Sequence, residues 1–244
     1  ITGKGYFFKV DEANRHRPDC YKELNLDLKA SNLCTEIMLH SSEEYTYTCV
    51  LSSMNVAKYD EWKDTDAVYW ATIFLDCVAQ EFIDKAKDIP GLEKAVAFTE
   101  KGRALGLGQC GLHTYLQSKW IPFESLEARY KSDEIAERIA IASWTASSAM
   151  GAVLGQPEWL EDTLDGKRNT HLIAIAPTKS TALIMGGISE GINPDPKVVF
   201  NQNTSAGEVE RITPIFLQLM KDKGVYTKKN IKSIEDAFGS CQHV

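Results

Sequence analysis

No two of the six cysteines in this 244-residue chain are spaced as C-x-x-C. Structural zinc sites and disulfide-rich secreted domains show such pairs or regular spacings, so the sequence indicates neither. The chain also lacks an apolar run long enough to span a membrane, and its first residues lack the charged-then-apolar layout of a secretory signal. These absences predict a protein of a reducing, cytoplasmic compartment with no membrane partner.

The chain has no excess of basic residues, since 27 lysines and arginines stand against 34 aspartates and glutamates, for a formal net charge of −7. This balance argues against a nucleic-acid partner, because binding to a nucleic-acid backbone depends on many cationic contacts to phosphates. A nucleotide monomer needs only a local anion site and is not excluded. With 43% hydrophobic residues and no internal repeat or low-complexity linker, residues 1–244 are expected to form one domain.

Hydrophobic spacing alternates along the chain between that of strands and that of helices, which predicts an α/β fold. Runs rich in β-branched, aromatic or aliphatic residues predict strands at 5–10, 32–39 and 45–51. The near-continuous apolar run at 169–176 predicts a strand buried on both faces of a parallel sheet. Helical spacing predicts helices at 64–87, 111–120, 132–154, 208–221 and 229–238.

Residues 32–36 put a thiol between an amide and a carboxylate. Because side chains alternate along a strand, Asn32, Cys34 and Glu36 are expected on one face. A nearby negative charge raises a cysteine pKa, so the arrangement favours hydrogen-atom chemistry on a neutral thiol over thiolate attack. Glu36 would then be a general base for a substrate hydroxyl, and the Asn32 amide would hold the same substrate. The alternative is that Cys34 packs as a small, buried hydrophobe.

The other cysteines outside this pattern suggest no chemistry of their own. Cys77 falls within the helical pattern at 64–87, and Cys110 stands beside a glycine where the helix at 111–120 begins, so both are expected to pack in the core. Cys20 and Cys241 lie in polar surroundings and are given no role.

Residues 178–181 read Thr-Lys-Ser-Thr and follow Pro177, which ends the apolar run. They supply hydroxyls, an ammonium group and backbone amides at the expected N-terminus of a helix at 182–185, and this geometry binds anions. Ordinary N-capping by Ser180 or Thr181 is the alternative.

Four segments resemble, in order, motifs of the large subunit of ribonucleotide reductase, in particular the class I enzymes of bacteria and their phages. Residues 31–37 resemble its active-site signature, and residues 48–55 resemble the segment that carries one of its substrate-reducing cysteines. Residues 103–108 resemble its Arg-x-Leu-Gly-x-Gly turn. Residues 168–181 resemble its substrate-phosphate loop, with residues 189–194 behind it.

The resemblance implies a fold and a role for each matching residue. The fold would be part of the ten-stranded α/β barrel of radical-using reductases, with the cysteine motif on a loop inside it. Cys34 would become a transient thiyl radical that takes the hydrogen from the ribose 3′ carbon. Glu36 would accept the 3′-hydroxyl proton, and Asn32 would hold the ribose. Cys49 would be one of two thiols that deliver electrons as the 2′-hydroxyl leaves as water.

Substrate contacts and partners also follow from the resemblance. The residues expected to hold the substrate are Ser31, Pro177, Thr178, Lys179, Ser180 and Thr181. The reaction would reduce ribonucleoside diphosphates for DNA synthesis, with thioredoxin or glutaredoxin as the reductant. No metal or cofactor is expected in this chain, because a small subunit with a metal centre such as di-iron supplies the radical. Large subunits of this family are expected to form a homodimer.

Several features of the family have no counterpart in the sequence. These are the partner of Cys49, the N-terminal nucleotide-binding regulatory region, the tyrosine pair that relays the radical and the C-terminal cysteine pair. We therefore expect the chain to be the catalytic middle of a large subunit. It would be either an excerpt or one product of a split gene, which assembles with the remaining large-subunit segments.

The sequence leaves three alternatives open. One is a cobalamin-dependent reductase, which shares a cysteine between asparagine and glutamate but needs no small subunit. Another is a non-catalytic nucleotide-binding fragment of a split large subunit. The third is a purely structural α/β domain with Cys34 and Cys49 in its core.

Overall fold

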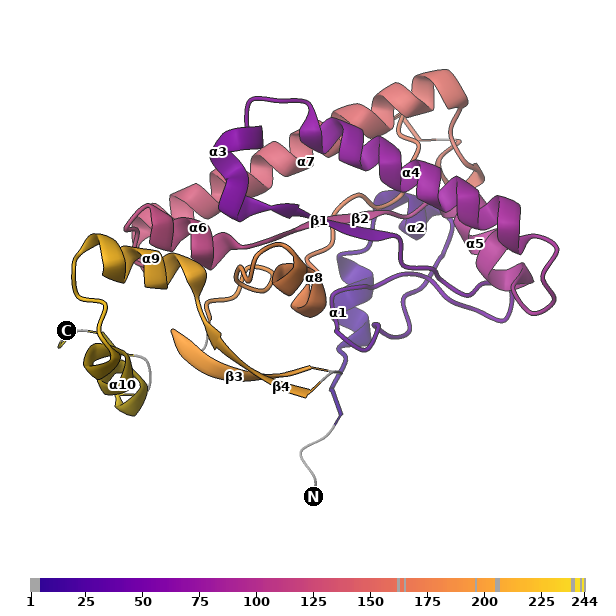
Figure 1. The fold of residues 1–244 in the computed structure, drawn as a ribbon. Coiled ribbons are helices and arrows are strands. Elements are labelled where there is room, and N and C mark those ends of the chain that lie inside the picture. Colours follow the sequence, from indigo (N-terminus) through magenta and orange to yellow (C-terminus); the bar gives the residue numbers. More distant parts are fainter. Residues whose placement is uncertain are drawn as a thin grey trace. The chain divides into compact units, whose positions relative to one another are not determined.

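The computed structural model describes residues 5–161, 163–164, 166–195, 197–204, 207–237, 240–241 and 243. Its longer helices are α4 (Ala67–Ala86), α5 (Glu93–Gly102), α7 (Leu126–Leu154), α9 (Pro214–Asp222) and α10 (Lys228–Asp236) (Figure 1). The shorter ones are α1 (Val10–Arg15), α2 (Asp19–Glu23), α3 (Tyr59–Trp62), α6 (Leu112–Ser118), α8 (Lys179–Ile184) and two 3₁₀ turns, η1 (Val56–Lys58) and η2 (Glu158–Leu160). Strands β1 (Leu51–Asn55) and β2 (Gly106–Cys110) form one sheet, and β3 (Val199–Thr204) and β4 (Gly207–Ile212) form another. This mixture confirms the α/β class.

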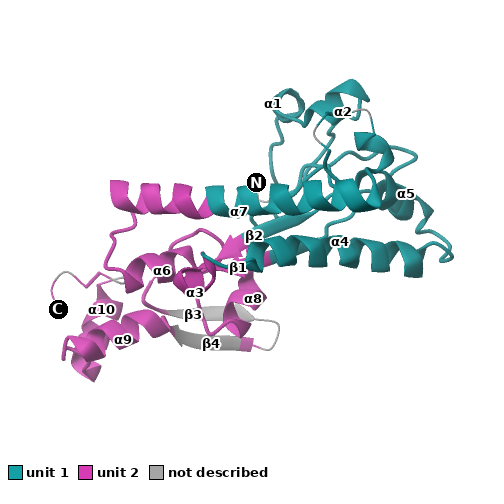
Figure 2. Ribbon diagram, turned by 90° about the horizontal axis from the view of Figure 1, so that it is seen from above, with its two compact units in different colours: residues 1–52, 64–108, 137–176 teal, residues 53–63, 109–136, 177–244 magenta. Residues whose placement is uncertain are grey.

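The chain divides into two compact units (Figure 2). Unit 1 comprises residues 1–52, 64–108 and 137–176, and unit 2 comprises residues 53–63, 109–136 and 177–244. The division passes through β1, β2 and α7. In the part of the chain that the structure describes, no helix is long and apolar enough to cross a membrane.

The three helices predicted in the middle of the chain are confirmed as α4, α6 and α7. In α4 the buried positions recur every three or four residues, which is the period of one helix face. Cys77 falls outside that stripe and is exposed, so its expected place in the core is wrong. Cys110 is fully buried, as expected, and Cys20 is buried as well.

The strands predicted near the N-terminus are wrong. Val10 begins α1 rather than ending a strand, with Asp11 and Glu12 in the first turn and Arg15 in the last, a charge order that stabilises the helix dipole. Residues 32–39 and 45–50 form no strand, and β1 begins only at Leu51.

Two further predictions differ from the structure at later positions. The segment at 171–176 is not a regular strand, although its His171 carbonyl accepts a hydrogen bond from the amide of Leu105, just before β2, and its Leu172 carbonyl accepts one from the amide of Leu107 in β2. It is not buried on both faces, because Ile173 is 42% exposed. The helix predicted at 208–221 begins only at Pro214, because residues 207–212 pair antiparallel with β3. The last predicted helix is confirmed as α10, and its expected end at Phe238 lies outside the described residues.

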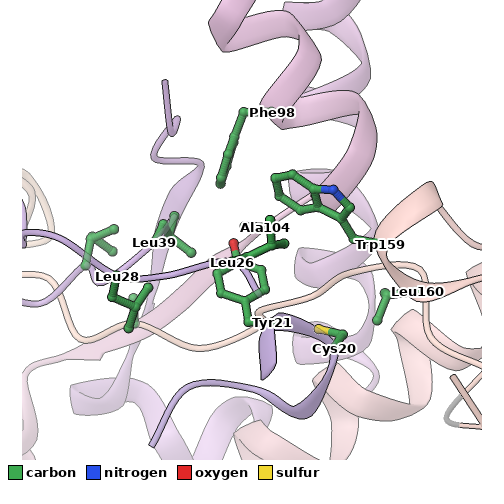
Figure 3. Packing of buried hydrophobic residues seen from close by; sticks show 11 residues of the cluster. Cys20, Tyr21, Leu26, Leu28, Leu39, Phe98, Ala104, Trp159 and Leu160 are labelled. Carbon is green, nitrogen blue, oxygen red and sulfur yellow. The ribbon is translucent and has the colours of Figure 1, made fainter. Parts of the chain in front are cut away.

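Aromatic and aliphatic side chains from distant segments build the core of unit 1 (Figure 3). Tyr21 from α2, Phe98 from α5 and Trp159 from η2 meet edge to face, with ring centroids 5.8 Å (Tyr21–Trp159) and 5.4 Å (Phe98–Trp159) apart. Such pairs stabilise a core beyond the burial of their area. The core therefore holds the N-terminal helices to the segments that follow α5 and α7.

A buried charge network links four segments of unit 1. The Asp76 carboxylate of α4 accepts two hydrogen bonds from Arg103 (2.8 and 2.9 Å), and both side chains are only 5% exposed. Asp76 also accepts from the amide of Asn169 (2.8 Å) and from Arg168 (3.0 Å). Burial alone would raise the pKa of Asp76, but these donors and the Arg103 charge hold it below its ordinary value. Ser147 of α7 joins the network by donating to the side-chain oxygen of Asn169 (2.8 Å).

Unit 2 packs around a smaller core. Cys110, Ala182 and Ile188 are buried together, with Ala57 and Met185 against them. The β3–β4 hairpin pairs Val199 with Ile212 and Thr204 with Gly207.

Replacing Asp76 by asparagine is expected to lower the free energy of unfolding by about 3–5 kcal/mol, because Arg103 would stay buried without its charge partner. Urea unfolding followed by circular dichroism measures the change. Glu81 on the same helix pairs with Lys85 at the surface, so Glu81→Gln is expected to cost less than about 1 kcal/mol. Equal losses in the two variants would contradict the importance of the network.

His171 is expected to make stability depend on pH. Burial first, and then the charge of Lys167, lowers the pKa of His171 to about 4. An unfolded histidine has a pKa of about 6.5, so between about pH 6.5 and 4 the unfolded chain binds a proton that the folded chain does not, and stability falls as the pH falls. His171→Gln should lose less stability than the wild type across this window. Melting temperatures measured at several pH values test this, and parallel pH profiles would refute it.

Candidate active site

The predicted site begins with a tight turn at residues 32–37. The Asn32 amide donates to the Ile37 carbonyl (3.2 Å), and the Ile37 amide donates to the Asn32 side-chain oxygen (3.0 Å). The Thr35 amide donates to the Asn32 carbonyl (3.1 Å), and Thr35 takes a left-handed φ of +67°. The strand prediction fails here because the Asn32 side chain gives the backbone a local hydrogen-bond partner.

The turn holds Cys34 at the surface of unit 1, where it is exposed. Cys49 is exposed too, so the interpretation of both cysteines as core residues is wrong. The Ser31 hydroxyl donates to the Asn32 carbonyl (3.1 Å). No described residue accepts a hydrogen bond from the side-chain nitrogen of Asn32, which leaves this donor available to a substrate.

Cys49 lies close enough to Glu36 and Cys34 for both side chains to influence its thiol. Partial burial is the main cause that raises the pKa of Cys49, and the negative charge of Glu36 and then the neighbouring Cys34 raise it further. The pKa of Tyr47 is raised by burial and then by Cys49 and Glu36. The structure thus brings Cys34, Glu36 and Cys49 together. In the structure the Glu36 carboxylate raises the pKa of Cys49, an effect that the sequence had predicted for Cys34.

Contacts on either side of Cys49 fix its position. The Thr48 hydroxyl bonds to that of Thr99 in α5 (2.8 Å), and the Val50 carbonyl accepts from the Gly106 amide (2.9 Å). Cys49 is therefore attached through one neighbour to α5 and through the other to the start of β2.

Residues 103–108, which resemble a family turn, lead from the end of α5 into β2. Arg103 ends α5 with a left-handed φ of +44°. A Cβ atom at Gly106 would lie 2.4 Å from the Leu51 side chain, and one at Gly108 would lie 2.2 Å from the Ala174 carbonyl oxygen. The glycines are thus required because β2 passes directly against β1 and the segment at 171–176.

Glu36 lines a cavity of about 640 Å³ in unit 1. Its Oε2 atom is buried and has no hydrogen-bond partner among the described residues. Leu28, Met38 and His171 also line the cavity, together with residues between 7 and 18. A buried carboxylate oxygen without a donor can accept a hydrogen bond from a bound molecule.

His171 and Tyr47 lie beside the predicted site residues but were not among them. His171 lies inside the segment 168–181 that resembles a family motif, and Tyr47 directly precedes the segment 48–55. Histidine and tyrosine are not among the residue types by which these segments resemble the family. Only the folded structure shows that Tyr47 lies beside Cys49 and Glu36 and that His171 lines the cavity with Glu36.

The residues predicted to bind phosphate lie in unit 2. Pro177 leads to Thr178, which has a left-handed φ of +56° and occupies the N-cap position of α8. The Thr178 hydroxyl accepts a hydrogen bond from the Gly191 amide (2.9 Å). The segments 178–181 and 189–194 are therefore neighbours, in agreement with the order of the motifs.

Helix α8 begins at Lys179, three residues before the expected start. The side chains of Lys179, Ser180 and Thr181 are exposed, and no side chain caps the helix. N-capping by Ser180 or Thr181 is therefore wrong, and anion binding by these groups stays a prediction.

Cys110 packs against α8 and the residue that follows it, Met185. Its thiol lies 3.6 Å from the Met185 sulfur and 3.7 Å from the Met54 carbonyl, and burial raises its pKa to about 11. Such a thiol is neutral and packs as a small apolar side chain. Within the described ranges, no three His, Cys, Asp or Glu residues are arranged to hold a metal ion.

Comparison with known proteins gives one consistent family. The sequence pattern of the family described as "Ribonucleotide reductase, barrel domain" matches residues 1–164 and 160–244. The putative ribonucleoside-diphosphate reductase large subunit of Frog virus 3 is 35% identical over 244 residues, which cover 100% of this chain and 43% of that protein. The large subunit of Invertebrate iridescent virus 3 is 32% identical over 247 residues, which cover 100% of this chain and 39% of that protein.

A solved structure agrees with these relatives. The class Id ribonucleotide reductase alpha subunit of Actinobacillus ureae is 42% identical, with a TM-score of 0.89 over 100% of this chain and 44% of that subunit. The chain spans less than half the length of each of these proteins. From its sequence pattern and its fold, the chain belongs to the ribonucleotide reductase family and forms part of the α/β barrel domain of that family.

Proposed function

We propose that this chain carries the reacting cysteines of a class I ribonucleoside-diphosphate reductase large subunit, which converts ribonucleoside diphosphates to 2′-deoxyribonucleoside diphosphates. One observation carries the proposal: Cys34, Glu36 and Cys49 are neighbours, and the carboxylate of Glu36 adds to the effect of burial in raising the pKa of Cys49. Similarity to a class Id alpha subunit supports this class over the cobalamin-dependent alternative.

The first step takes place at the ribose 3′ carbon. A thiyl radical at Cys34 removes the 3′ hydrogen atom, so an S–H bond forms, a C–H bond breaks and the unpaired electron moves to the carbon. The buried Oε2 of Glu36 accepts the 3′-hydroxyl proton, and the Asn32 side-chain nitrogen donates to the same substrate. In the complete enzyme, a small subunit with a metal centre would supply the oxidising equivalent that makes the Cys34 radical.

The second step removes the 2′ hydroxyl. Because its pKa is raised, the Cys49 thiol is protonated at neutral pH and can give its proton to the leaving hydroxyl, which departs as water. Cys49 and a second thiol of the whole large subunit together supply two electrons and become a disulfide. Cys34 then returns its hydrogen atom to the 3′ carbon and becomes a radical again. Thioredoxin or glutaredoxin reduces the disulfide.

Substrate phosphates would be held by residues of unit 2. The exposed Lys179 contributes a positive charge, and Ser180 and Thr181 contribute hydroxyl donors. Ser31 and Pro177 would help to hold the substrate by fixing the backbone next to Asn32 and Thr178. The complete enzyme would contain the remaining large-subunit segments, a second large subunit and the small subunit.

Cys34→Ser is expected to abolish deoxynucleotide formation, because a serine hydroxyl does not replace a thiol as a hydrogen-atom carrier. The assay uses the whole large subunit with its small subunit and dithiothreitol, and chromatography measures the product. Cys77→Ser, on the exposed face of α4, is the matched control and should keep full turnover. Deoxynucleotide formation by Cys34→Ser would contradict the proposal.

Cys49→Ser is expected to stop deoxynucleotide formation while leaving the first step intact. Hydrogen abstraction depends on Cys34 and Glu36, so a substrate carrying tritium at the 3′ carbon should still release tritium to water. Both the tritium release and the product are measured with the same complete enzyme. Repeated turnover by Cys49→Ser would show that Cys49 is not a reducing thiol.

A further inference from the structure

The cavity beside Glu36 has the size and lining of a small-molecule site. Its volume of about 640 Å³ lies within the usual range for ligand pockets, which are largely apolar with a few polar groups. Phe8, Leu28 and Met38 supply apolar surface. The polar atoms come from Lys9, Glu12, His16, Arg17, Glu36 and His171. Every one of these residues belongs to unit 1.

Hydrogen bonding fixes which nitrogen of His171 carries the proton. The Thr170 hydroxyl must donate its only proton to the Gly102 carbonyl (2.9 Å), because a carbonyl can only accept. The Thr170 oxygen therefore accepts from the Nδ1 atom of His171, which lies 3.0 Å away. In the neutral ring, Nε2 is then left without a proton and can only accept a hydrogen bond.

The ring is also held in place and kept neutral. Tyr21 meets His171 edge to face, with ring centroids 5.0 Å apart. Burial and the charge of Lys167 lower the pKa of His171 to about 4, so the ring is uncharged at neutral pH. Nε2 has no hydrogen-bond partner among the described residues.

The Oε2 atom of Glu36 and the Nε2 atom of His171 are thus two acceptors that line one cavity, and no hydrogen bond from a described residue occupies either of them. We propose that His171 is a substrate-positioning residue, which accepts a hydrogen bond through Nε2 from the nucleoside part of the substrate while Glu36 accepts another from its ribose. This inference rests on the proposed function and adds a binding residue to its site. The donor that meets His171 is a ribose hydroxyl, an exocyclic amine or a ring N–H of the base, since these are the donors that a nucleoside carries.

Two substitutions separate the roles of the two ring nitrogens. His171→Asn keeps a donor near the place of Nδ1, so the bond to Thr170 can persist, but it removes the acceptor at Nε2. His171→Gln places a carbonyl oxygen near Nε2 and restores an acceptor. His243→Asn, the same change at an exposed position, is the control.

The experiment measures binding of a ribonucleoside diphosphate by calorimetry to the whole large subunit in a Cys34→Ser background, where no turnover occurs. His171→Asn is expected to weaken binding about tenfold, the effect of one hydrogen bond of about 1.4 kcal/mol, and His171→Gln should recover most of it. Equal affinities of His171→Asn and the parent, or equal losses in both His171 variants, would overturn the inference.

The same measurements distinguish this inference from the proposed function. If the parent binds ribonucleoside diphosphates and His171→Asn binds them equally well, only the role of His171 fails. If Cys34→Ser retains turnover, the proposed function fails whatever the His171 variants do. Melting temperatures of both variants show whether a loss of affinity follows a loss of folding, and an affinity loss that tracks melting in both would count against positioning.

Discussion

Asp76 accepts hydrogen bonds from Arg103, Arg168 and Asn169 in the interior of unit 1. A carboxylate buried without such partners would cost several kcal/mol, so the surrounding segments must stay where they satisfy it. Arg103 begins the segment that becomes β2, and Arg168 and Asn169 begin the segment that leads to His171. Arg168 also donates to the Leu154 and Gly155 carbonyls at the end of α7. A single charge on α4 therefore fixes the starting points of β2 and of the segment at 171–176, which bonds to it.

From these starting points, the packing of β2 determines the surroundings of Cys49. Gly106 and Gly108 let β2 pass without side chains against Leu51 and Ala174, and the Gly106 amide bonds to Val50. Cys49 is thereby held near Glu36, and the charge of Glu36 favours the protonated thiol. The Cys49 thiol therefore keeps its proton and can donate it to a substrate.

Periodicity predicted the long helices α4 and α7 because many turns repeat the same buried face. It failed for residues 5–10 and 32–39, where a short apolar run fits a strand, a helix start or a turn equally well. At 32–39 the turn forms because the Asn32 side chain accepts a hydrogen bond from the Ile37 amide. Composition and periodicity do not predict such a bond. The motifs marked Cys34, Glu36 and Cys49, and the structure brings these residues into one neighbourhood. The motifs could not reveal His171 as an acceptor, because its tautomer depends on a chain of hydrogen bonds through Thr170 and Gly102 that exists only in the folded protein.

The Asn32 carboxamide has two ends with separate tasks. Its oxygen closes the turn on Ile37, and that turn keeps Thr35, a β-branched residue, in a left-handed conformation that is unfavourable on its own. Its nitrogen is the end that remains for a ligand. An aspartate would preserve the first task and lose the second, whereas an alanine would lose both. The mechanical support of the Cys34 loop and the recognition of its substrate thus share one side chain but can be separated chemically.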